Sequence, residues 1–470
     1  MFALACVAFF TTCGGPFGIE PLVAAVGPGL AVVLILATPL VWTVPMALMV
    51  AELATLMPEE GGYYVWVRET LGPFWAVQEA WWTMGYSTAL LAIFPVLFMS
   101  YLSFFVPSLN PATATHPGLA ALLRWLGAVL VAITATLVNL QGAREVGRSA
   151  KISAVFVVGA FALLALLWLK RGPALGRVAH LITGDLTSNH GTALLLGLSI
   201  IVYNYSGWDN VSTFAAEVDR PRRNYPRAIA LAVVVVILIY VVPVIAGLSV
   251  NTDPQTWSTD AGWPVLAHMI GGRWLGILIT AAALLSSWAL FNAQLLYVSR
   301  LPYVMARDGW LADVLARVSP NTGVPKTAIV GFCLLTALFA TLSFGGLAVI
   351  QCVLYTGALT LELLALIILR RRRPDAARPF RIPGGWWGLA YVCVPPLGFA
   401  VLVVLATLRD WRSFPGQLLV IAAIVLSGII LYFSRRKSFV PVHDQAQDDG
   451  DALVRSQSEV GPEVGVRLRN

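Results

Sequence analysis

Two short segments place glycine, proline and polar residues inside otherwise apolar stretches. The first is Thr11–Gly18 (TTCGGPFG), which is followed by Glu20, and the second is Tyr203–Asn210 (YNYSGWDN), which contains Asp209. Glycine and proline both disfavour the helix, and proline also lacks a backbone donor. Each segment therefore predicts a break in a helix with an acid beside it.

Unwound backbone can bind a small charged molecule at both of its ends. Amide groups at the start of the following half-helix carry partial positive charge and suit a carboxylate, so we expect Gly14–Gly18 to anchor one. Carbonyls at the end of the preceding half-helix, around Thr12 and Tyr205, suit an ammonium group. The candidate binding residues are Gly14, Gly15, Pro16, Phe17, Gly18, Tyr203, Asn204, Tyr205, Ser206, Gly207 and Trp208.

The acids beside the breaks have two interpretations. A charged group inside an apolar span costs about 2.5 to 3.5 kcal/mol, so Glu20 and Asp209 are candidates to bind an ammonium group or to carry a proton. Alternatively, each caps the half-helix that follows it. Ser287 and Asn292 are further candidates to line the site, whereas Glu79 and Glu362 receive no role from the sequence.

The elements that must position these residues are membrane helices. The chain has 470 residues, of which 58% are hydrophobic and 12% charged, and its mean hydropathy is +0.78. Apolar runs long enough to cross a bilayer recur along the whole chain, and backbone in lipid must be helical, so we expect an all-α polytopic membrane protein with about twelve helices. The predicted spans are 2–26, 29–57, 73–106, 119–140, 151–169, 191–216, 228–250, 274–299, 325–343, 346–369, 387–408 and 414–434.

The two breaks fall in the first and sixth spans, at equivalent places in two sets of five. Because five is odd, the second set must enter the membrane from the opposite side, which is the layout of a 5+5 inverted repeat with a central binding site. A simple kink in each helix is the alternative, since glycine and proline are common in membrane helices. We divide the chain into repeats at 1–170 and 191–370, two accessory helices at 387–434 and a disordered tail at 435–470.

The basic residues indicate topology. Most of the 31 lysines and arginines fall in alternate loops and in the tail, so the positive-inside rule predicts that both termini are cytoplasmic and that the protein lies in the cell membrane. The run Arg370–Arg373 directly follows a span and lacks interleaved aromatics, so it indicates a membrane anchor and not a nucleic-acid site.

Several function classes are excluded by missing motifs. The sequence has no Walker loop, which excludes an ATP-driven pump, and its five histidines are scattered, which argues against a metal-dependent hydrolase. Its five cysteines lack CxxC spacing, so we expect neither a zinc site nor a disulfide framework. We expect no enzyme activity, no metal and no cofactor. A channel stays open as an alternative.

Several motifs resemble the amino acid–polyamine–organocation superfamily of secondary transporters. The first break with Ile19-Glu20, the loop Pro58–Tyr63 and the segment Trp208–Thr213 occur in the family's order, as do Ala306–Gly309 and Arg378–Pro383. The resemblance implies the leucine-transporter-type fold with discontinuous helices 1 and 6. It is nearest to the branch of polyamine-uptake and L-amino-acid-transporter-like permeases.

The chain also departs from that branch. The resemblance would place an acid near Leu90 and Leu91 and another at Gln294, and a polyamine needs such anionic partners. We therefore expect a permease of amino acids, with a proton as the coupling ion for symport by alternating access, and we keep polyamine uptake as the alternative and exchange as a further one. Some members of the family carry a lysine deep in helix 5 at the position of a sodium ion, but Lys151 lies near the end of its span. Sodium coupling therefore stays open, and so does the oligomeric state.

Overall fold

The computed structural model describes residues 9, 12–57, 59, 61–172, 176, 194–210, 221–258 and 262–437. Within these residues every regular element is a helix, which confirms the all-α prediction. Nine helical runs in this described part are long and apolar enough to cross a membrane, and Leu194–Tyr205 and Lys326–Phe339 are shorter apolar helices. With the first helix, most of whose first half lies outside the described residues, this agrees with about twelve membrane helices.

Most of the long helices follow the predicted spans, although α8 and α11 begin several residues earlier and the short helices α5, α12, α13 and α15 were not predicted. In the first part of the chain they are α2 Glu20–Val26, α3 Pro28–Thr38, α4 Val44–Leu56, α5 Tyr63–Leu71, α6 Pro73–Leu102, α7 Pro117–Asn139 and α8 Ala143–Lys170. In the second part they are α10 Leu194–Tyr205, α11 Pro221–Val250, α12 Pro254–Ser258, α13 Trp263–Gly271, α14 Arg273–Val298, α15 Arg300–Arg307, α16 Lys326–Phe339, α17 Phe344–Arg372, α18 Gly385–Asp410 and α19 Pro415–Arg435.

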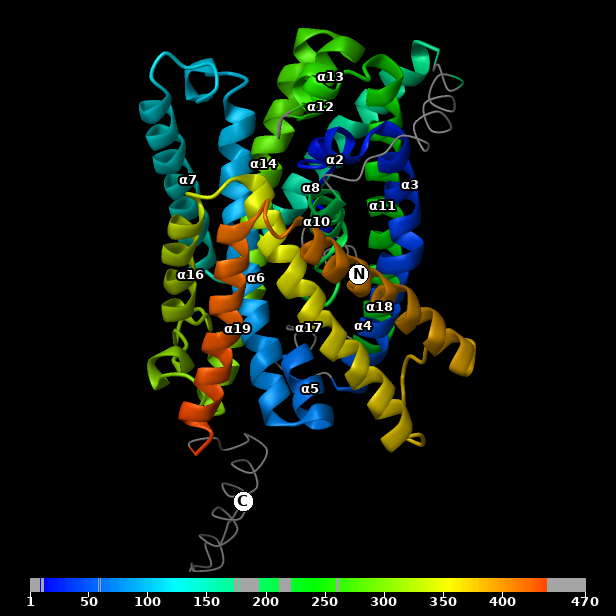
Figure 1. Cartoon of the computed structure of the whole chain (residues 1–470), viewed down its shortest axis with the longest axis vertical. Helices are drawn as coiled ribbons and strands as arrows, with labels where there is room; N and C mark the ends of the chain where they lie inside the picture. Colours follow the sequence, from blue (N-terminus) through cyan, green and yellow to red (C-terminus); the bar gives the residue numbers. More distant parts are fainter. Residues whose placement is uncertain are drawn as a thin grey trace, which may run out of the picture.

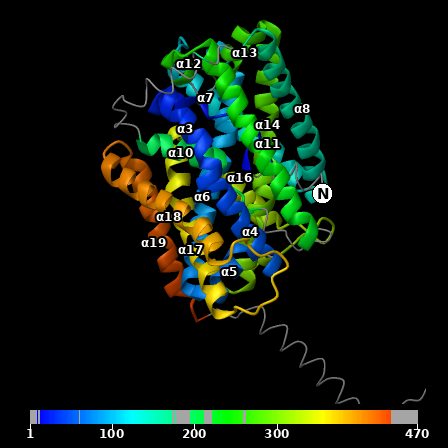
Figure 2. The ribbon, with the colours of Figure 1, turned by 90° about the vertical axis from the view of Figure 1, so that its right-hand side faces the viewer.

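The helices form one elongated bundle (Figure 1). The short helix α5 lies at one end of it and α12 and α13 lie at the other, as Figures 1 and 2 both show. We call these the α5 end and the α13 end. Helix α6 begins beside α5, whereas α17 runs in the opposite direction and ends at the α5 end, so these two closely packed helices are antiparallel.

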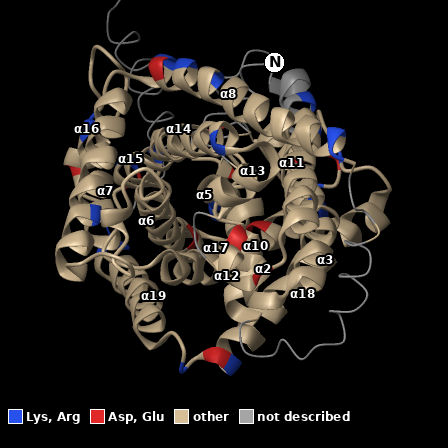
Figure 3. Cartoon of the chain, turned by 90° about the horizontal axis from the view of Figure 1, so that it is seen from above, with Lys and Arg blue, Asp and Glu red and all other residues tan. Residues whose placement is uncertain are grey.

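Burial separates central helices from peripheral ones. In the most apolar window, 83% of α6 is buried, against 28% of α7 and 6% of α19. Exposed leucines such as Leu130, Leu334 and Leu426 cover the peripheral helices, as expected of surfaces that face lipid. Seen along the bundle in Figure 3, acidic positions lie inside it near α2, α10 and α17. The centre of the bundle is therefore the place for a polar site.

A π-helical turn at Pro39–Thr43 joins α3 to α4, so the second predicted span is one helix from Pro28 to Leu56. Pro39 and Pro45 cannot donate backbone hydrogen bonds, and the wider turn accommodates this loss.

The 5+5 repeat and the division into repeats and accessory helices stay predictions. Of the expected tail, α19 includes Arg435, and residues 438–470 lie outside the described part.

Candidate functional site

The first break spans Cys13–Ile19, between the helical residue Thr12 and the start of α2. Three of its glycines have left-handed backbone, with φ of 65° at Gly14, 118° at Gly15 and 81° at Gly18. Side chains other than glycine rarely adopt these angles. A Cβ atom on Gly14 would also lie 2.6 Å from Leu290 of α14. The glycines therefore allow the unwound chain to pass close to its neighbours.

The amide groups of the three glycines in this break have acceptors within the protein. Gly14 N donates to Phe9 O at 3.1 Å, Gly15 N to Cys13 Sγ at 3.3 Å, and Gly18 N to Glu20 Oε2 at 2.9 Å. These are the donors that the sequence assigns to a substrate carboxylate. In this conformation Glu20 occupies part of that position, at the amide group of Gly18.

Glu20 is fully buried and accepts hydrogen bonds from three directions. Besides Gly18 N, its donors are Tyr101 OH at 2.6 Å and Trp263 N, at the start of α13, at 3.3 Å. The Trp263 indole N–H donates in turn to Pro16 O at 2.6 Å. Glu20 thus joins the first break to α6 and α13. It is the first residue of α2, but its carboxylate bonds Gly18 N, which precedes the helix.

Aromatic rings close the first break on its α13 side. Phe17 meets Tyr101 and Phe161 edge-on, each with ring centroids 5.3 Å apart, and Phe161 meets Trp263 at 5.7 Å. We call Phe17, Tyr101, Phe161 and Trp263 the aromatic lid. Edge-to-face contacts of this kind are favourable in addition to the area they bury. The lid separates the breaks from the α13 end of the bundle.

The second break begins where α10 ends, at Tyr205. Gly207 has a φ of 95°, and its N–H donates to Tyr355 OH of α17 at 3.3 Å. The same tyrosine hydroxyl donates to Asp209 Oδ1 at 2.8 Å, and Tyr86 OH of α6 donates to Asp209 Oδ2 at 3.3 Å. Asp209 is buried, so two tyrosines hold its carboxylate between α6 and α17.

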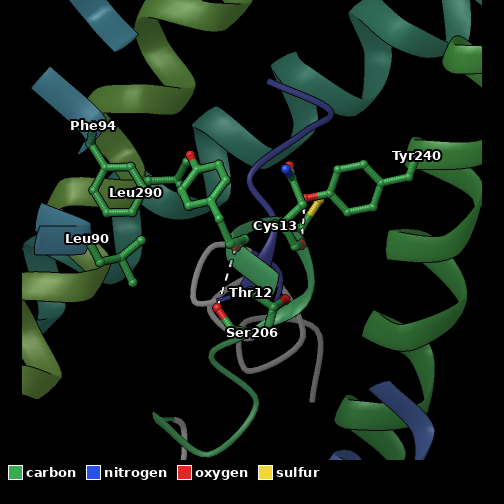
Figure 4. A pocket seen from close by; sticks show the side chains of 9 residues that line it. Thr12, Cys13, Leu90, Phe94, Ser206, Tyr240 and Leu290 are labelled. Carbon is green, nitrogen blue, oxygen red and sulfur yellow. Dashed lines mark hydrogen bonds between the residues drawn. The ribbon is translucent and has the colours of Figure 1, made fainter. Parts of the chain in front are cut away.

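A small pocket lies between the two breaks. Figure 4 shows Thr12 and Cys13 of the first break facing Ser206 of the second, with Tyr240 to one side. The complete lining is Thr12, Cys13, Leu90, Phe94, Tyr203, Asn204, Ser206, Tyr240 and Leu290. The Asn204 amide donates to Gly18 O at 3.5 Å, and Tyr240 OH donates to Asn204 O at 2.7 Å. The pocket thus offers hydroxyl and carbonyl oxygens between apolar walls.

The structure brings together some of the predicted residues but not all of them. Tyr203, Asn204 and Ser206 line the pocket, whereas Phe17 belongs to the aromatic lid. Tyr205 points elsewhere and donates to Ile35 O at 3.1 Å. Trp208 is completely buried but is not part of the pocket lining.

On α14 the residues that reach the site differ from those that the sequence suggests. Ser286, and not its neighbour Ser287, donates to Gly14 O, and Leu290 lines the pocket. Asn292 accepts from Asn139 Nδ2 of α7 at 2.9 Å instead. Successive residues point about 100° apart on a helix, so a shift of one position changes the neighbour.

Two acids without a role in the sequence analysis lie near Asp209. Glu79 of α6 and Glu362 of α17 are buried and interact electrostatically with Asp209 and with each other. The only sequence signal for them is an acid inside an apolar span. The α6–α17 packing that joins them could not be predicted.

Ion pairs join helices at the α5 end. Glu52 of α4 is fully buried and accepts from Arg370 Nε of α17 at 2.9 Å, and it lies 3.2 Å from Arg378 Nε in the following loop. Arg68 of α5 pairs with Asp308 at 2.8 Å. Burial, and then the Asp308 carboxylate, raise the pKa of Tyr64 well above its usual value, so that its hydroxyl stays a donor to Asp308.

Comparison with known proteins agrees with this architecture. The model of the amino acid permease family matches residues 1–425. The polyamine transporter PUT1 of Oryza sativa subsp. japonica is 36% identical over 416 residues, which are 87% of this chain and 74% of the relative. The polyamine transporter RMV1 of Arabidopsis thaliana is 33% identical over 426 residues, with 90% and 82% covered. The branched-chain amino acid permease BcaP of Bacillus subtilis is 26% identical over 427 residues, with 88% and 87% covered.

The chain therefore belongs to the amino acid permease family. It is a membrane transporter and not an enzyme, as its sequence predicts. Its substrate is a small molecule of the kind these permeases carry, an amino acid or a polyamine.

Proposed function

We propose that the chain imports polyamines by proton symport, with the two breaks as the substrate site. The sign of the buried charge carries this proposal. Among the residues whose burial is described, the lysine and arginine side chains that are nearly buried lie at the α5 end, where Arg370 and Arg378 pair with Glu52 and Arg68 pairs with Asp308. The charged groups around the breaks are Glu20 and Asp209, with Glu79 and Glu362 beyond Asp209. Such an interior favours a cation over a zwitterion.

The backbone hydrogen bonds of the first break also favour a cationic substrate over a zwitterion. A carboxylate needs amide donors, but those of Gly14, Gly15 and Gly18 have acceptors within the protein. An ammonium group needs oxygen acceptors, which Thr12, Tyr203 and Ser206 supply in the pocket. These observations compensate for the missing acids at Leu90, Leu91 and Gln294. The relatives named polyamine transporters are also more similar to this chain than BcaP is.

The proposed orientation places the α5 end in the cytoplasm. Arg68, Arg300, Arg307 and the run Arg370–Arg373 belong to helices that lie or end there, in agreement with the positive-inside rule and a place in the cell membrane. The aromatic lid then faces outward. In alternating access, its rings would separate to admit substrate, and the helices that contain the breaks would move to release it inward.

An amino acid is the second candidate, because the family model and BcaP point to that substrate class. Purified protein in liposomes under an inward proton gradient separates the two, with labelled putrescine and spermidine beside branched-chain and basic amino acids. We expect accumulation of a polyamine that a protonophore abolishes and that excess amino acid does not reduce. Accumulation of amino acids alone would contradict the proposal. Stimulation by substrate inside the vesicle separates a carrier from a channel.

The variant D209N tests the site within the same assay. Removing the carboxylate leaves two tyrosine donors without an anion, so we expect polyamine uptake to fall to the level of empty liposomes. Glu145→Gln is the matched control, since Glu145 is only partly buried at the start of α8. Normal uptake by D209N would show that Asp209 is not needed for transport and only holds the second break in place.

A further inference from the structure

The facing surfaces of α6 and α17 are arranged in two levels between the breaks and the α5 end. At the first level Tyr86 of α6 meets Tyr355 of α17, with ring centroids 5.0 Å apart. Glu79 lies seven residues from Tyr86 toward the α5 end, and Glu362 lies seven residues from Tyr355 in the same direction. Seven residues are two helical turns, about 10 Å along the axis, and return to the same face. The two acids therefore form the second level, which we call the inner acid pair.

The inner acid pair has too few donors for two ionised carboxylates. Glu79 Oε1 accepts from Thr83 OH at 2.9 Å, but Glu79 Oε2 and Glu362 Oε2 are buried without a hydrogen-bond partner. In the part of the chain that the structure describes, no lysine or arginine pairs with either acid. Nor do these residues contain a group of three His, Cys, Asp or Glu side chains that could hold a metal ion.

An unpartnered hydroxyl faces the pair from a third helix. Tyr63, the first residue of α5, is fully buried, and its hydroxyl has no hydrogen-bond partner. It interacts electrostatically with Glu79 and with Glu362. A phenol oxygen can accept a hydrogen bond from a protonated carboxyl group. An ionised carboxylate would offer it no such donor.

A proton is the ligand that fits these surroundings. Two neighbouring buried carboxyl groups cannot both be ionised, because their charges repel and water is excluded. Glu79 is 0% exposed and Glu362 1%, so a larger cation cannot reach them unless helices move apart. A bound proton removes one charge and creates a donor for the free oxygens and for Tyr63.

The pair is connected to the second break. Both acids interact with Asp209, and Tyr355 contacts both Asp209 and Gly207 N. A change of charge at the pair therefore alters the field at the backbone of the break. The titratable groups that interact electrostatically with the pair are Tyr63 of α5, Tyr86 of α6, Asp209 of the break and Tyr355 of α17, and Tyr297 of α14 interacts with Tyr63 and Asp209.

We propose that Glu79 and Glu362 together form the proton-binding site that couples transport to the proton gradient. A proton from water on the outer side binds one carboxylate of the pair, and the same proton returns to water on the cytoplasmic side when the helices open there. This inference rests on the proposed proton-driven function, but it is independent of whether the substrate is a polyamine or an amino acid.

The test compares E79Q, E362Q and the control E145Q in liposomes. Three quantities are measured: accumulation under a proton gradient, exchange of labelled for unlabelled substrate at equal pH, and alkalinisation of the outer solution. We expect E79Q and E362Q to lose accumulation and proton movement but to keep exchange, which requires an intact site and no net proton transfer. The control E145Q should match the unmodified protein in all three.

Other outcomes contradict the proposal in recognisable ways. Gradient-driven accumulation with an unchanged pH profile in both variants would exclude the pair as the proton site. Weaker substrate binding with proton movement retained would make the pair a subsite for the substrate's ammonium group. If the unmodified protein shows no gradient-driven uptake, the proposed function fails instead.

A second variant covers the case in which the glutamine variants do not fold. Y63F keeps both carboxyl groups and removes only the unpartnered hydroxyl. We expect the pH midpoint of its uptake to shift, because the pair loses a hydroxyl group that can accept from its protonated form. An unchanged midpoint in Y63F would contradict the assignment.

Discussion

Glu20 and the inner acid pair are both buried in the bundle, but their surroundings differ. Glu20 accepts from Gly18 N, Tyr101 OH and Trp263 N. In the inner acid pair one oxygen has the Thr83 hydroxyl, and two oxygens have no partner. Because its oxygens meet donors from three segments, Glu20 holds those segments together. The inner acid pair lacks such donors, so it is available for a proton.

The largest effect is expected from Gly18→Leu, which disrupts the backbone beside Glu20. The φ of 81° disfavours any side chain, and a Cβ atom would lie 3.1 Å from Tyr203 and 3.2 Å from Leu97. We expect complete loss of substrate binding and exchange, while the protein still inserts and purifies. Gly159→Ala is the control, since its Cβ would meet nothing within 4 Å. Normal affinity in Gly18→Leu would remove the first break from the site.

Glu52→Gln tests a third kind of buried acid, one that is paired with cations. The change leaves Arg370 and Arg378 without an anion in a buried setting. Breaking a buried ion pair costs about 3–5 kcal/mol. A clear fall in the melting temperature in detergent is therefore expected. Glu69→Gln, at a partly exposed pair with Arg373, should change it little. Equal stability of both variants would show that Glu52 is not essential to the fold.

Glu20→Gln examines whether Glu20 acts structurally. The glutamine amide group is a donor, so it must face one of the three donors that now bond the carboxylate. An unsatisfied buried group costs about 1–3 kcal/mol, which corresponds to roughly a 5- to 150-fold slower uptake if the lid must close in each cycle. The proton-to-substrate ratio should not change. A changed ratio, measured with a pH-sensitive dye, would make Glu20 part of the coupling site.

The smallest effect is expected when single tyrosine hydroxyls are removed. Tyr101→Phe takes one donor from Glu20, and Tyr355→Phe takes one from Asp209 and an acceptor from Gly207 N. Each change costs about 1 kcal/mol, or roughly fivefold in affinity. We expect only Tyr355→Phe to shift the pH profile of uptake. If only Tyr101→Phe shifted the pH profile of uptake, Glu20 and not the acids near the second break would carry the coupled proton.

Much of this architecture could be predicted from the sequence because its signals are local. Glycine and proline clusters give the two breaks, and the long apolar runs give the helices. The occupied amide of Gly18 was not foreseen, although Glu20 is only two residues away, because the direction of a side chain at a break depends on tertiary contacts. The inner acid pair depends on how α6 and α17 pack, and its members are almost three hundred residues apart.

The contact between Glu52 and Arg370 also affects how the chain is made. The two residues are 318 positions apart, and the backbone N–H of Ile382 donates to the same carboxylate at 2.8 Å. While the ribosome is still synthesising the second half, the early helix that carries Glu52 lacks these partners. A nascent chain cut short before Arg370 keeps an acid that lipid does not tolerate. The buried charge of Glu52 is therefore balanced only after the chain has been synthesised beyond Arg370.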